Sequence, residues 1–386
     1  MRVIVAPQEF KGTLSARQAA DAMAEGARRA LPDADIEAVP LADGGPGTVE
    51  AVVAAAGGRI LTTTVQDPLG RPVEAPWGLL DAGTAVIEMA AAAGLTLLRP
   101  EERDPRVAST YGVGQLVTAA LDRGCRRLII GTGGSATNDG GAGLAQALGA
   151  HLLDAAGRDL PPGGAALARL HRIDASGLDP RLHGASVVAA ADVTNPLCGP
   201  AGASVVYGPQ KGASPEVAAE LDAALRRYAE VIQRDLGINV LEAPGAGSAG
   251  GLAAGLIAFL RAEVRPGIEV VAGVVRFRER LAGADLVLTG EGRLDGQTAY
   301  GKTVAGVARM AAALGVPVLV VPGALGPGWE AILPLVAGVE PIAGAAATAD
   351  DAMARPAALL ALTVERALRG WLRMESIREQ FEREGP

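Results

Sequence analysis

The sequence predicts an α/β protein with two domains, and three observations support this. Strands and helices alternate at the start of the chain, the same alternation returns near its end, and short β-rich segments follow the first alternation. Strands that alternate with helices favour parallel pairing in a sheet covered by helices. The length of 386 residues also exceeds what a single hydrophobic core usually organises.

The first 56 residues contain two strand–helix pairs. An apolar strand at Val3–Ala6 is followed by Ser15, a typical helix N-cap, and by a helix that runs to about Leu31. A second strand at Ile36–Leu41 and a second helix at Thr48–Ala56 repeat this order. The start of the chain therefore predicts a parallel β-α-β-α unit.

The pattern changes at residue 59. Short β-rich segments at Arg59–Val65, Val73–Leu80 and Ala85–Met89 are separated by turn residues, which predicts an antiparallel or mixed sheet. Alternation then resumes, with helices expected at Leu116–Arg123, Leu144–Leu148 and Pro215–Leu236 and strands at Arg127–Gly131, Ser186–Ala191 and near Ile268–Val271.

The end of the chain resembles its start. A strand at Asp285–Thr289, a helix at Thr303–Leu314 and a strand at Val316–Val321 form a closing β-α-β unit, and Ala357–Leu372 predicts a final helix. Similar ends around a different middle indicate a discontinuous domain that carries an insertion. We expect a Rossmann-like domain at 1–65 and 283–386, and an inserted mixed-sheet α/β domain at 66–282.

The net charge, the hydropathy and the cysteine content exclude several classes of function. The formal net charge of -8 argues against a nucleic-acid or anionic-membrane surface, and no apolar stretch is long enough to span a bilayer. The N-terminus leads directly into a strand and not into a signal peptide. Two cysteines, Cys125 and Cys198, are too few for a disulfide framework, so we expect a reduced cytoplasmic setting.

Lysine is rare in this sequence. Among 35 basic residues only Lys11, Lys211 and Lys302 are lysine, and each has a glycine beside it. Where arginine supplies most positive charge, a retained lysine suggests a need for a compact point charge. Lysine next to glycine is typical of a phosphate or carboxylate site, although chance survival on loops is the alternative.

The densest glycine segment runs from Gly131 to Gly143. It follows an expected strand, precedes an expected helix, and contains Ser135, Thr137, Asn138 and Asp139. A strand–loop–helix edge presents backbone N–H groups to an anion. The segment contains more glycine and polar residues than a tight turn alone requires, so we expect it to bind a ligand.

Two other segments match the sequence patterns of nucleotide-binding motifs but lack the flanking features that those motifs require. Gly296–Thr303 fits the P-loop pattern, but six residues separate it from the end of its strand at Thr289. Gly245–Gly250 fits the dinucleotide pattern, but the strand expected next lacks a terminal acidic residue. A nicotinamide-dependent oxidoreductase using Gly245–Gly250 is therefore the alternative function.

Carboxylates follow several expected strands. Asp43 and Asp192 come after strands of the first and middle regions, and Glu291, Arg293 and Asp295 follow the strand that ends at Thr289. Ligands of open α/β sheets bind beyond the carboxyl ends of strands. Singly, each acidic residue is explained by a turn or helix cap. Together with the lysines and glycine loops, they indicate Mg²⁺-assisted phosphoryl transfer.

Seven motifs in order carry a resemblance to the type-1 glycerate kinase family. They are Ala6-Pro7 with Phe10-Lys11-Gly12, Leu41 to Gly45 with Gly47-Thr48, Ile87 to Ala90, Gly133 to Gly141, Asp192-Val193 with Asn195 to Leu197, Tyr207 to Ala213, and Thr289 to Asp295. The resemblance covers residues 1 to about 330. It implies phosphorylation of the 2-hydroxyl of D-glycerate by ATP with Mg²⁺, in a site between two α/β domains.

The resemblance, with the residue patterns, nominates the site. The catalytic candidates are Lys11, Asp43, Asp192, Lys211, Glu291, Arg293 and Asp295, with Asp192 and Asp295 as metal ligands. The anion- or nucleotide-binding candidates are Gly133, Gly134, Ser135, Asn138, Asp139, Asn195, Gln210 and Lys302. Asp192 is expected to be the general base or a metal ligand, and Lys11 to neutralise the acceptor carboxylate or the transferred phosphoryl group.

Four positions depart from the family pattern. Gln8, Pro46 and Gln115 replace customary carboxylates, and Glu9 is an additional one. If all of them face the site, the site has lost about two negative charges on balance. The resemblance therefore leaves open an acceptor related to glycerate, or a binding homologue without catalysis.

Overall fold

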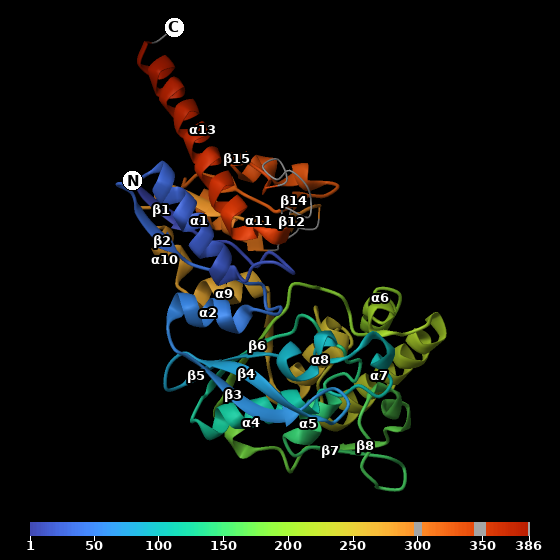
Figure 1. The fold of residues 1–386 in the computed structure, drawn as a ribbon. Helices are drawn as coiled ribbons and strands as arrows, with labels where there is room; N and C mark the ends of the chain where they lie inside the picture. The colour runs from blue at the N-terminus through green and yellow to red at the C-terminus, as the bar shows by residue number, and fades with distance from the viewer. Residues whose placement is uncertain (297–302, 343–352, 385–386) are drawn as a thin grey trace. The chain divides into compact units, whose positions relative to one another are not determined.

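The computed structural model describes residues 1–296, 303–342 and 353–384, with side chains described up to residue 376. The chain divides into two compact units (Figure 1). The discontinuous domain comprises Met1–Ala42, Glu50–Ala56 and Val271–Pro386, and the inserted domain comprises Asp43–Val49 and Gly57–Val270. In the described part of the chain, no helix combines the length and apolar character needed to cross a membrane.

The discontinuous domain is built on a five-stranded parallel sheet in the order β15-β13-β11-β1-β2. Its strands are β1 (Arg2–Val5), β2 (Asp35–Ala38), β11 (Leu286–Thr289), β13 (Val318–Val320) and β15 (Gly338–Val339), with the small pair β12 (Arg293–Leu294) and β14 (Ala324–Leu325). The helices are α1 (Ala16–Ala30), α2 (Thr48–Ala56), α9 (Gly267–Val274), α10 (Phe277–Leu281), α11 (Thr303–Ala312), η7 (Trp329–Leu335) and α13 (Pro356–Glu384).

The first and last helices of the chain pack together in this domain (Figure 1). Ser15 caps α1 with a reciprocal capping box to Gln18, as its sequence predicts. Gly26 allows the close approach, because a Cβ there would lie 2.1 Å from the Ala361 carbonyl oxygen of α13. Leu360 and Val364 of α13 are buried in the same apolar cluster as the buried face of α1.

The inserted domain contains a six-stranded mixed sheet in the order β10-β9-β6-β5-β4-β3. Its strands are β3 (Arg59–Gln66), β4 (Pro72–Leu79), β5 (Thr84–Glu88), β6 (Arg127–Gly131), β9 (Ser186–Ala190) and β10 (Glu263–Arg265), with a separate pair β7 (His151–Leu153) and β8 (Arg172–Asp174). The helices are α3 (Ala90–Ala93), α4 (Tyr111–Asp122), α5 (Ala142–Ala147), α6 (Ala203–Tyr207), α7 (Pro215–Leu236) and α8 (Ser248–Leu260). Short 3₁₀ helices are η1 (Leu95–Leu97), η2 (Pro100–Glu102), η3 (Gly164–Arg169), η4 (Pro180–Gly184) and η5 (Pro209–Lys211).

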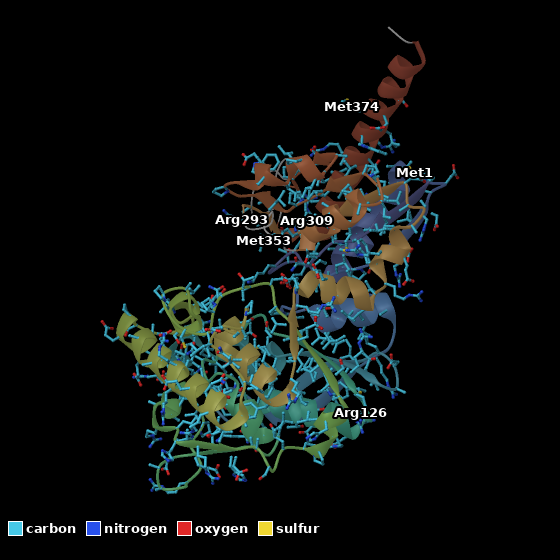
Figure 2. The ribbon with its side chains drawn as sticks, turned by 180° about the vertical axis from the view of Figure 1, so that it is seen from behind. Met1, Arg126, Arg293, Arg309, Met353 and Met374 are labelled. Carbon is cyan, nitrogen blue, oxygen red and sulfur yellow. The ribbon has the colours of Figure 1, made fainter. Side chains whose placement is uncertain are left out.

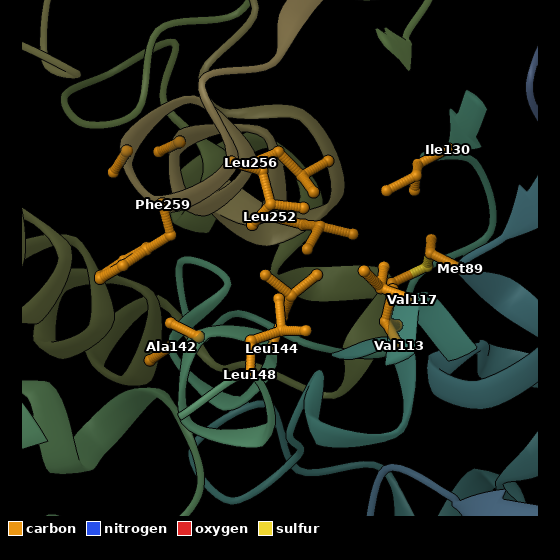
Figure 3. Packing of buried hydrophobic residues seen from close by; sticks show 14 of the residues in the cluster. Met89, Val113, Val117, Ile130, Ala142, Leu144, Leu148, Leu252, Leu256 and Phe259 are labelled. Carbon is orange, nitrogen blue, oxygen red and sulfur yellow. The ribbon is translucent and has the colours of Figure 1, made fainter. Parts of the chain in front are cut away.

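One apolar core fills the inserted domain. Figure 3 shows side chains of α4, β6, α5 and α8 converging with Met89, which follows β5; among them are Val113, Leu144, Leu252 and Leu256. All five are fully buried. This packing fixes the helices against the sheet and so fixes the loops that leave its strands.

The fold class predicted from the sequence is confirmed: both domains are α/β, one with a parallel and one with a mixed sheet. Two segments differ from the expected arrangement. The chain enters the inserted domain earlier than residue 66, because all eight residues of β3 pair with β4. The strand expected near Ile268–Val271 is instead part of helix α9, which Gly267 begins.

Candidate active site

Four parallel strands of the inserted domain end at the same edge of its sheet. The pairing of β5 with β6, of β6 with β9, and of β9 with β10 is parallel and in close register. Their last residues are Glu88, Gly131, Ala190 and Arg265. The loops that follow these residues therefore lie together, as the sequence pattern of loop-borne polar residues predicts.

The loop from Asp43 to Thr48 crosses this edge. The Gly133 N–H donates to the Gly44 carbonyl at 3.0 Å, and the Thr48 hydroxyl donates to the Gly45 carbonyl at 2.6 Å. A Cβ at Gly131 would lie 2.4 Å from the Gly44 carbonyl oxygen. Glycine is therefore required where the loop and the strand end approach each other.

The Asp43 backbone and the Asp192 carboxylate both lie against Gly267. The Gly267 N–H donates to Asp192 Oδ1 at 2.6 Å, and a Cβ at Gly267 would lie 1.8 Å from the Asp43 carbonyl oxygen. The Asp43 carboxylate accepts from the Gly45 N–H at 3.1 Å, which fixes its turn. Asp192 is exposed and Asp43 half-exposed, so both can meet a ligand.

The first part of the glycine segment is also accessible. Gly133 is half-exposed and Gly134 exposed, with Gly134 in the left-handed region at φ 78°. The Leu95 N–H donates to the Gly134 carbonyl at 2.9 Å, and Ser135 pairs with Gly94 in an isolated bridge. Backbone N–H groups at such a turn can donate hydrogen bonds to a bound anion.

The second part of the segment lies in the interior. Asn138 and Asp139 are 0% exposed. Asp139 accepts from the Thr110 N–H and hydroxyl at 2.8 and 2.9 Å and from the N–H groups of Gly141 and Gly143. Burial raises the pKa of Asp139, while these four donors oppose that rise. Their expected roles toward an anion stay predictions. In the structure, both side chains form hydrogen bonds within the interior of the domain.

Three other candidates lie on the loops after β9. The Asn195 amide donates to the Ala201 carbonyl at 2.8 Å and its oxygen accepts from the Tyr207 hydroxyl at 2.7 Å. Gln210 is exposed. Lys211, in contrast, is only 1% exposed, and its ammonium donates to the Thr137 carbonyl at 2.6 Å. Lys211 thus lies under the glycine segment and not on a surface.

The remaining candidates form a second group in the discontinuous domain, beyond the ends of β1 and β11. A Cβ at Gly292 would lie 3.0 Å from the Lys11 backbone nitrogen, so the two loops are in contact. Lys11 and Arg293 are exposed (Figure 2 labels Arg293), and Glu291 and Asp295 are half-exposed. Lys302 lies outside the described residues, as does most of the segment Gly296–Thr303.

The segment Gly245–Gly250 is buried, which does not fit a dinucleotide loop. A Cβ at Gly250 would lie 2.0 Å from the Thr137 carbonyl oxygen, and one at Gly247 would lie 2.2 Å from that of Pro196. Glycine is needed here for close packing against neighbouring loops. The oxidoreductase alternative loses its binding segment.

Sequence reasoning missed four residues of the edge as site candidates. The Glu88 carboxylate accepts from the Val49 N–H at 2.6 Å, and the Thr132 hydroxyl pairs with that of Ser248 at 2.7 Å. Gly267 supports Asp192, as described above. Glu88 follows a strand directly, a signal that was available, whereas the contact of Thr132 with Ser248 joins residues 116 positions apart.

Carboxylate oxygens are suitable ligands for Mg²⁺, which proteins usually hold with one or two carboxylates and the phosphates of a substrate. Asp43 and Asp192 are accessible carboxylates at this edge, and a role of either toward a metal stays a prediction. Within the described ranges, no group of three or more acidic, histidine or cysteine side chains is arranged to bind a metal by itself.

The fold and these two sets of residues are those of a two-domain α/β protein that carries polar residues on loops beyond the ends of parallel strands. The family model described as "Glycerate kinase family" matches residues 3–372. The chain belongs to the glycerate kinase family and is a kinase, which excludes the oxidoreductase alternative and the non-catalytic one.

Several relatives are similar over most of their length. A glycerate kinase of Halalkalibacterium halodurans is 51% identical over 331 residues, covering 86% of this chain and 87% of that protein. A glycerate 2-kinase of Escherichia coli K12 is 50% identical over 326 residues, covering 84% and 86%. A solved structure of a protein assigned as glycerate kinase 2 from Salmonella typhimurium LT2 is 46% identical, with TM-score 0.87 and coverage of 97% and 99%.

Proposed function

We propose that the protein transfers the γ-phosphoryl group of ATP to the 2-hydroxyl of D-glycerate, with Mg²⁺, and forms 2-phosphoglycerate. The observation that supports this proposal is the position of the Asp43 backbone and the exposed Asp192 carboxylate against Gly267, at the edge of a sheet in a chain of the glycerate kinase family. Phosphoryl transfer requires carboxylates to orient the nucleophile and cations to balance charge.

Asp192 is the proposed group that orients the acceptor hydroxyl and accepts its proton. One carboxylate oxygen accepts from the Gly267 N–H at 2.6 Å, which fixes the orientation of the side chain, and the residue is exposed. A carboxylate of ordinary basicity is sufficient, because the transition state of phosphoryl transfer is loose and the attacking oxygen loses its proton late.

Lys11 and Arg293 are the proposed cations for the carboxylate of the acceptor and the phosphates. Both are exposed on loops beyond the ends of β1 and β11. The accessible N–H groups near Gly133 and Gly134 are a further anion-binding element. The expected position of the site between the two domains stays a prediction.

Asp192 and Asp295 are the expected ligands of Mg²⁺, and the accessible Asp43 is a further candidate. The metal supplies positive charge to the phosphate oxygens when bound. The carboxylates also determine how many negative charges the site carries. This number must remain small, because the bound phosphates are negative as well.

The departures from the family pattern differ in what they touch. Gln115 Oε1 accepts from the Gln66 N–H at 2.7 Å and so joins α4 to β3, which is a structural role. Pro46 is exposed in the loop beside Gly134. Gln8 Oε1 is buried without a hydrogen-bond partner in the described chain. Because these departures leave the acceptor open, D-glycerate is best compared with hydroxy acids of similar size as substrates. Both cysteines are buried and unpaired, which is compatible with the expected cytoplasmic setting.

The test is an ADP-release assay with D-glycerate, L-glycerate, glycolate, lactate and tartronate. We expect the highest kcat/KM with D-glycerate, and a product that enolase converts without a mutase, because enolase accepts 2-phosphoglycerate directly. A product that requires the mutase would show transfer to the 3-hydroxyl. ADP release with none of these acids would overturn the proposal.

A further inference from the structure

Five polar side chains are buried together beneath the glycine segment of the inserted domain. Thr137, Asn138, Asp139 and Tyr228 are 0% exposed, and Lys211 is 1% exposed. We call them the Lys211 cluster. Burying a lysine ammonium is costly unless it is bonded, so its position here requires an explanation.

The ammonium of Lys211 is bonded to the loop that carries the site. Lys211 Nζ donates to the Thr137 carbonyl at 2.6 Å, and a hydrogen bond from a charged donor is stronger than a neutral one. The cluster also holds two buried acceptors, Thr137 Oγ1 and Asn138 Oδ1, that have no hydrogen-bond partner in the described residues. Oxygen atoms of this kind favour a neighbouring positive charge.

Few backbone bonds hold this part of the loop. The Ala136 N–H donates to the Ala93 carbonyl at 2.9 Å, and the Gly140 N–H donates to the Gly250 carbonyl at 3.1 Å. Between these two points side chains provide the contacts, with Asn138 donating to Ser204 at 2.9 Å and Lys211 to Thr137. The Asp139 carboxylate, which accepts from Thr110, is a further anchor, so Lys211 is one of three side-chain anchors that these bonds give the segment.

We propose that Lys211 is a positioning residue that holds the segment Ser135–Asp139 from inside the domain and so places the Gly133–Gly134 turn at the sheet edge. This inference rests on the proposed function, because we expect the loss of Lys211 to lower the rate of glycerate phosphorylation. With 1% of its surface exposed, Lys211 is placed to act on the loop from inside and not at its surface. A neutral side chain without a donor would release the Thr137 carbonyl and loosen the turn.

The experiment compares Lys211→Met with Lys211→Gln. Both replacements are uncharged and have the same number of atoms along the chain, but only glutamine keeps an N–H donor. The matched control is Arg169→Met, which removes an exposed positive charge from the same domain. For each protein, amide hydrogen exchange is measured without substrate, and kcat and KM are measured with D-glycerate and ATP.

We expect Lys211→Met to accelerate exchange in residues 133–143 while β3 and β4 keep their wild-type exchange. Its kcat/KM should fall at least about tenfold, because small displacements of binding groups are costly to the rate. Lys211→Gln should retain more of both properties, and Arg169→Met should match the wild type. If Lys211→Met does not fold, Lys211→Gln against the wild type carries the same comparison.

Two results would overturn the inference. Unchanged exchange in residues 133–143 together with a large loss of kcat/KM would show that Lys211 acts in another way. Unchanged exchange and unchanged kcat/KM would show that it does not position the loop. A wild-type protein without glycerate kinase activity refutes the proposed function instead, while the exchange measurement still tests the anchor.

Discussion

Gly267→Ala is the sharpest test of the arrangement of Asp43 and Asp192. Gly267 lies at the start of α9, where its N–H donates to Asp192 and its α-carbon faces the Asp43 carbonyl. An added Cβ would lie 1.8 Å from that oxygen and 3.1 Å from Asp192 Oδ1. The substitution therefore acts on the Asp43 backbone and on the Asp192 carboxylate at once without removing either residue.

The magnitude follows from the contact distances. A Cβ rarely comes within about 3 Å of a neighbouring atom, so the Asp43 loop has to move by roughly 1.2 Å (3.0 minus the 1.8 Å that the structure gives). Overpacking of this kind costs about 1–3 kcal/mol of unfolding free energy. A displacement of about 1 Å in a site can reduce the rate about 100-fold.

The assay is kcat/KM for D-glycerate, with unfolding measured in parallel. Gly273→Ala is the matched control, because Gly273 is in the same helix and an added Cβ there has no atom within 4 Å. Alanine at this helical position should leave activity unchanged and stabilise the protein by up to about 1 kcal/mol. A folded Gly267→Ala protein with kcat/KM within about threefold of Gly273→Ala would refute the reasoning.

Three further predictions concern single side chains. Asp192→Asn keeps an acceptor for Gly267 but removes the charge, so kcat should fall by at least about 100-fold with the same melting temperature; a kcat within threefold of wild type would exclude Asp192 as the base. Burial lowers the pKa of Lys211 from 10.5 to about 7, against the opposing effect of Asp139. The unfolded chain then binds more protons between these pH values, so the unfolding free energy should rise with pH by up to about 1.4 kcal/mol per unit from pH 7 upward. Denaturant titrations of wild type and Lys211→Met at pH 7, 8 and 9 measure this, and equal slopes would contradict it. The Tyr228 hydroxyl is buried without a partner in the described chain, so Tyr228→Phe should leave stability unchanged or raise it by up to about 1 kcal/mol. A loss above about 2 kcal/mol in thermal or chemical unfolding would show that the hydroxyl is bonded.

Local patterns predicted the fold well where one element determines its own limits. The helix α2 begins and ends where the sequence placed it, and Ser15 is the N-cap of α1 as expected. The helix α9 was misread as a strand because Ile268–Val271 is short and apolar, and periodicity alone does not separate these cases. Its first residues continue from β10 through Pro266, which is a favourable residue before a helix start.

The candidate site was predicted only in part, for a physical reason. Asp43 and Asp192 were nominated because each follows an expected strand; these strands belong to different sheets, and it is the Asp43–Thr48 loop that reaches the edge where Asp192 follows β9. The burial of Lys211 was not predictable, because a lysine beside glycine reads as a surface loop in sequence alone. Its depth depends on the packing of α6, α7 and the glycine segment, which are separated by tens of residues.

The order of strands in the discontinuous domain has a consequence for synthesis. Strand β1 lies between β2 and β11, and Val3 pairs with Leu286. At translation rates of about 5–20 residues per second, β1 waits roughly 15–60 s for this neighbour. Over that interval an almost continuous stretch, residues 57–270, has left the ribosome with its own core. We therefore expect the inserted domain to fold first. Until the last helix is made, the N-terminal β-α-β segment must stay in solution unaided or be bound by chaperones.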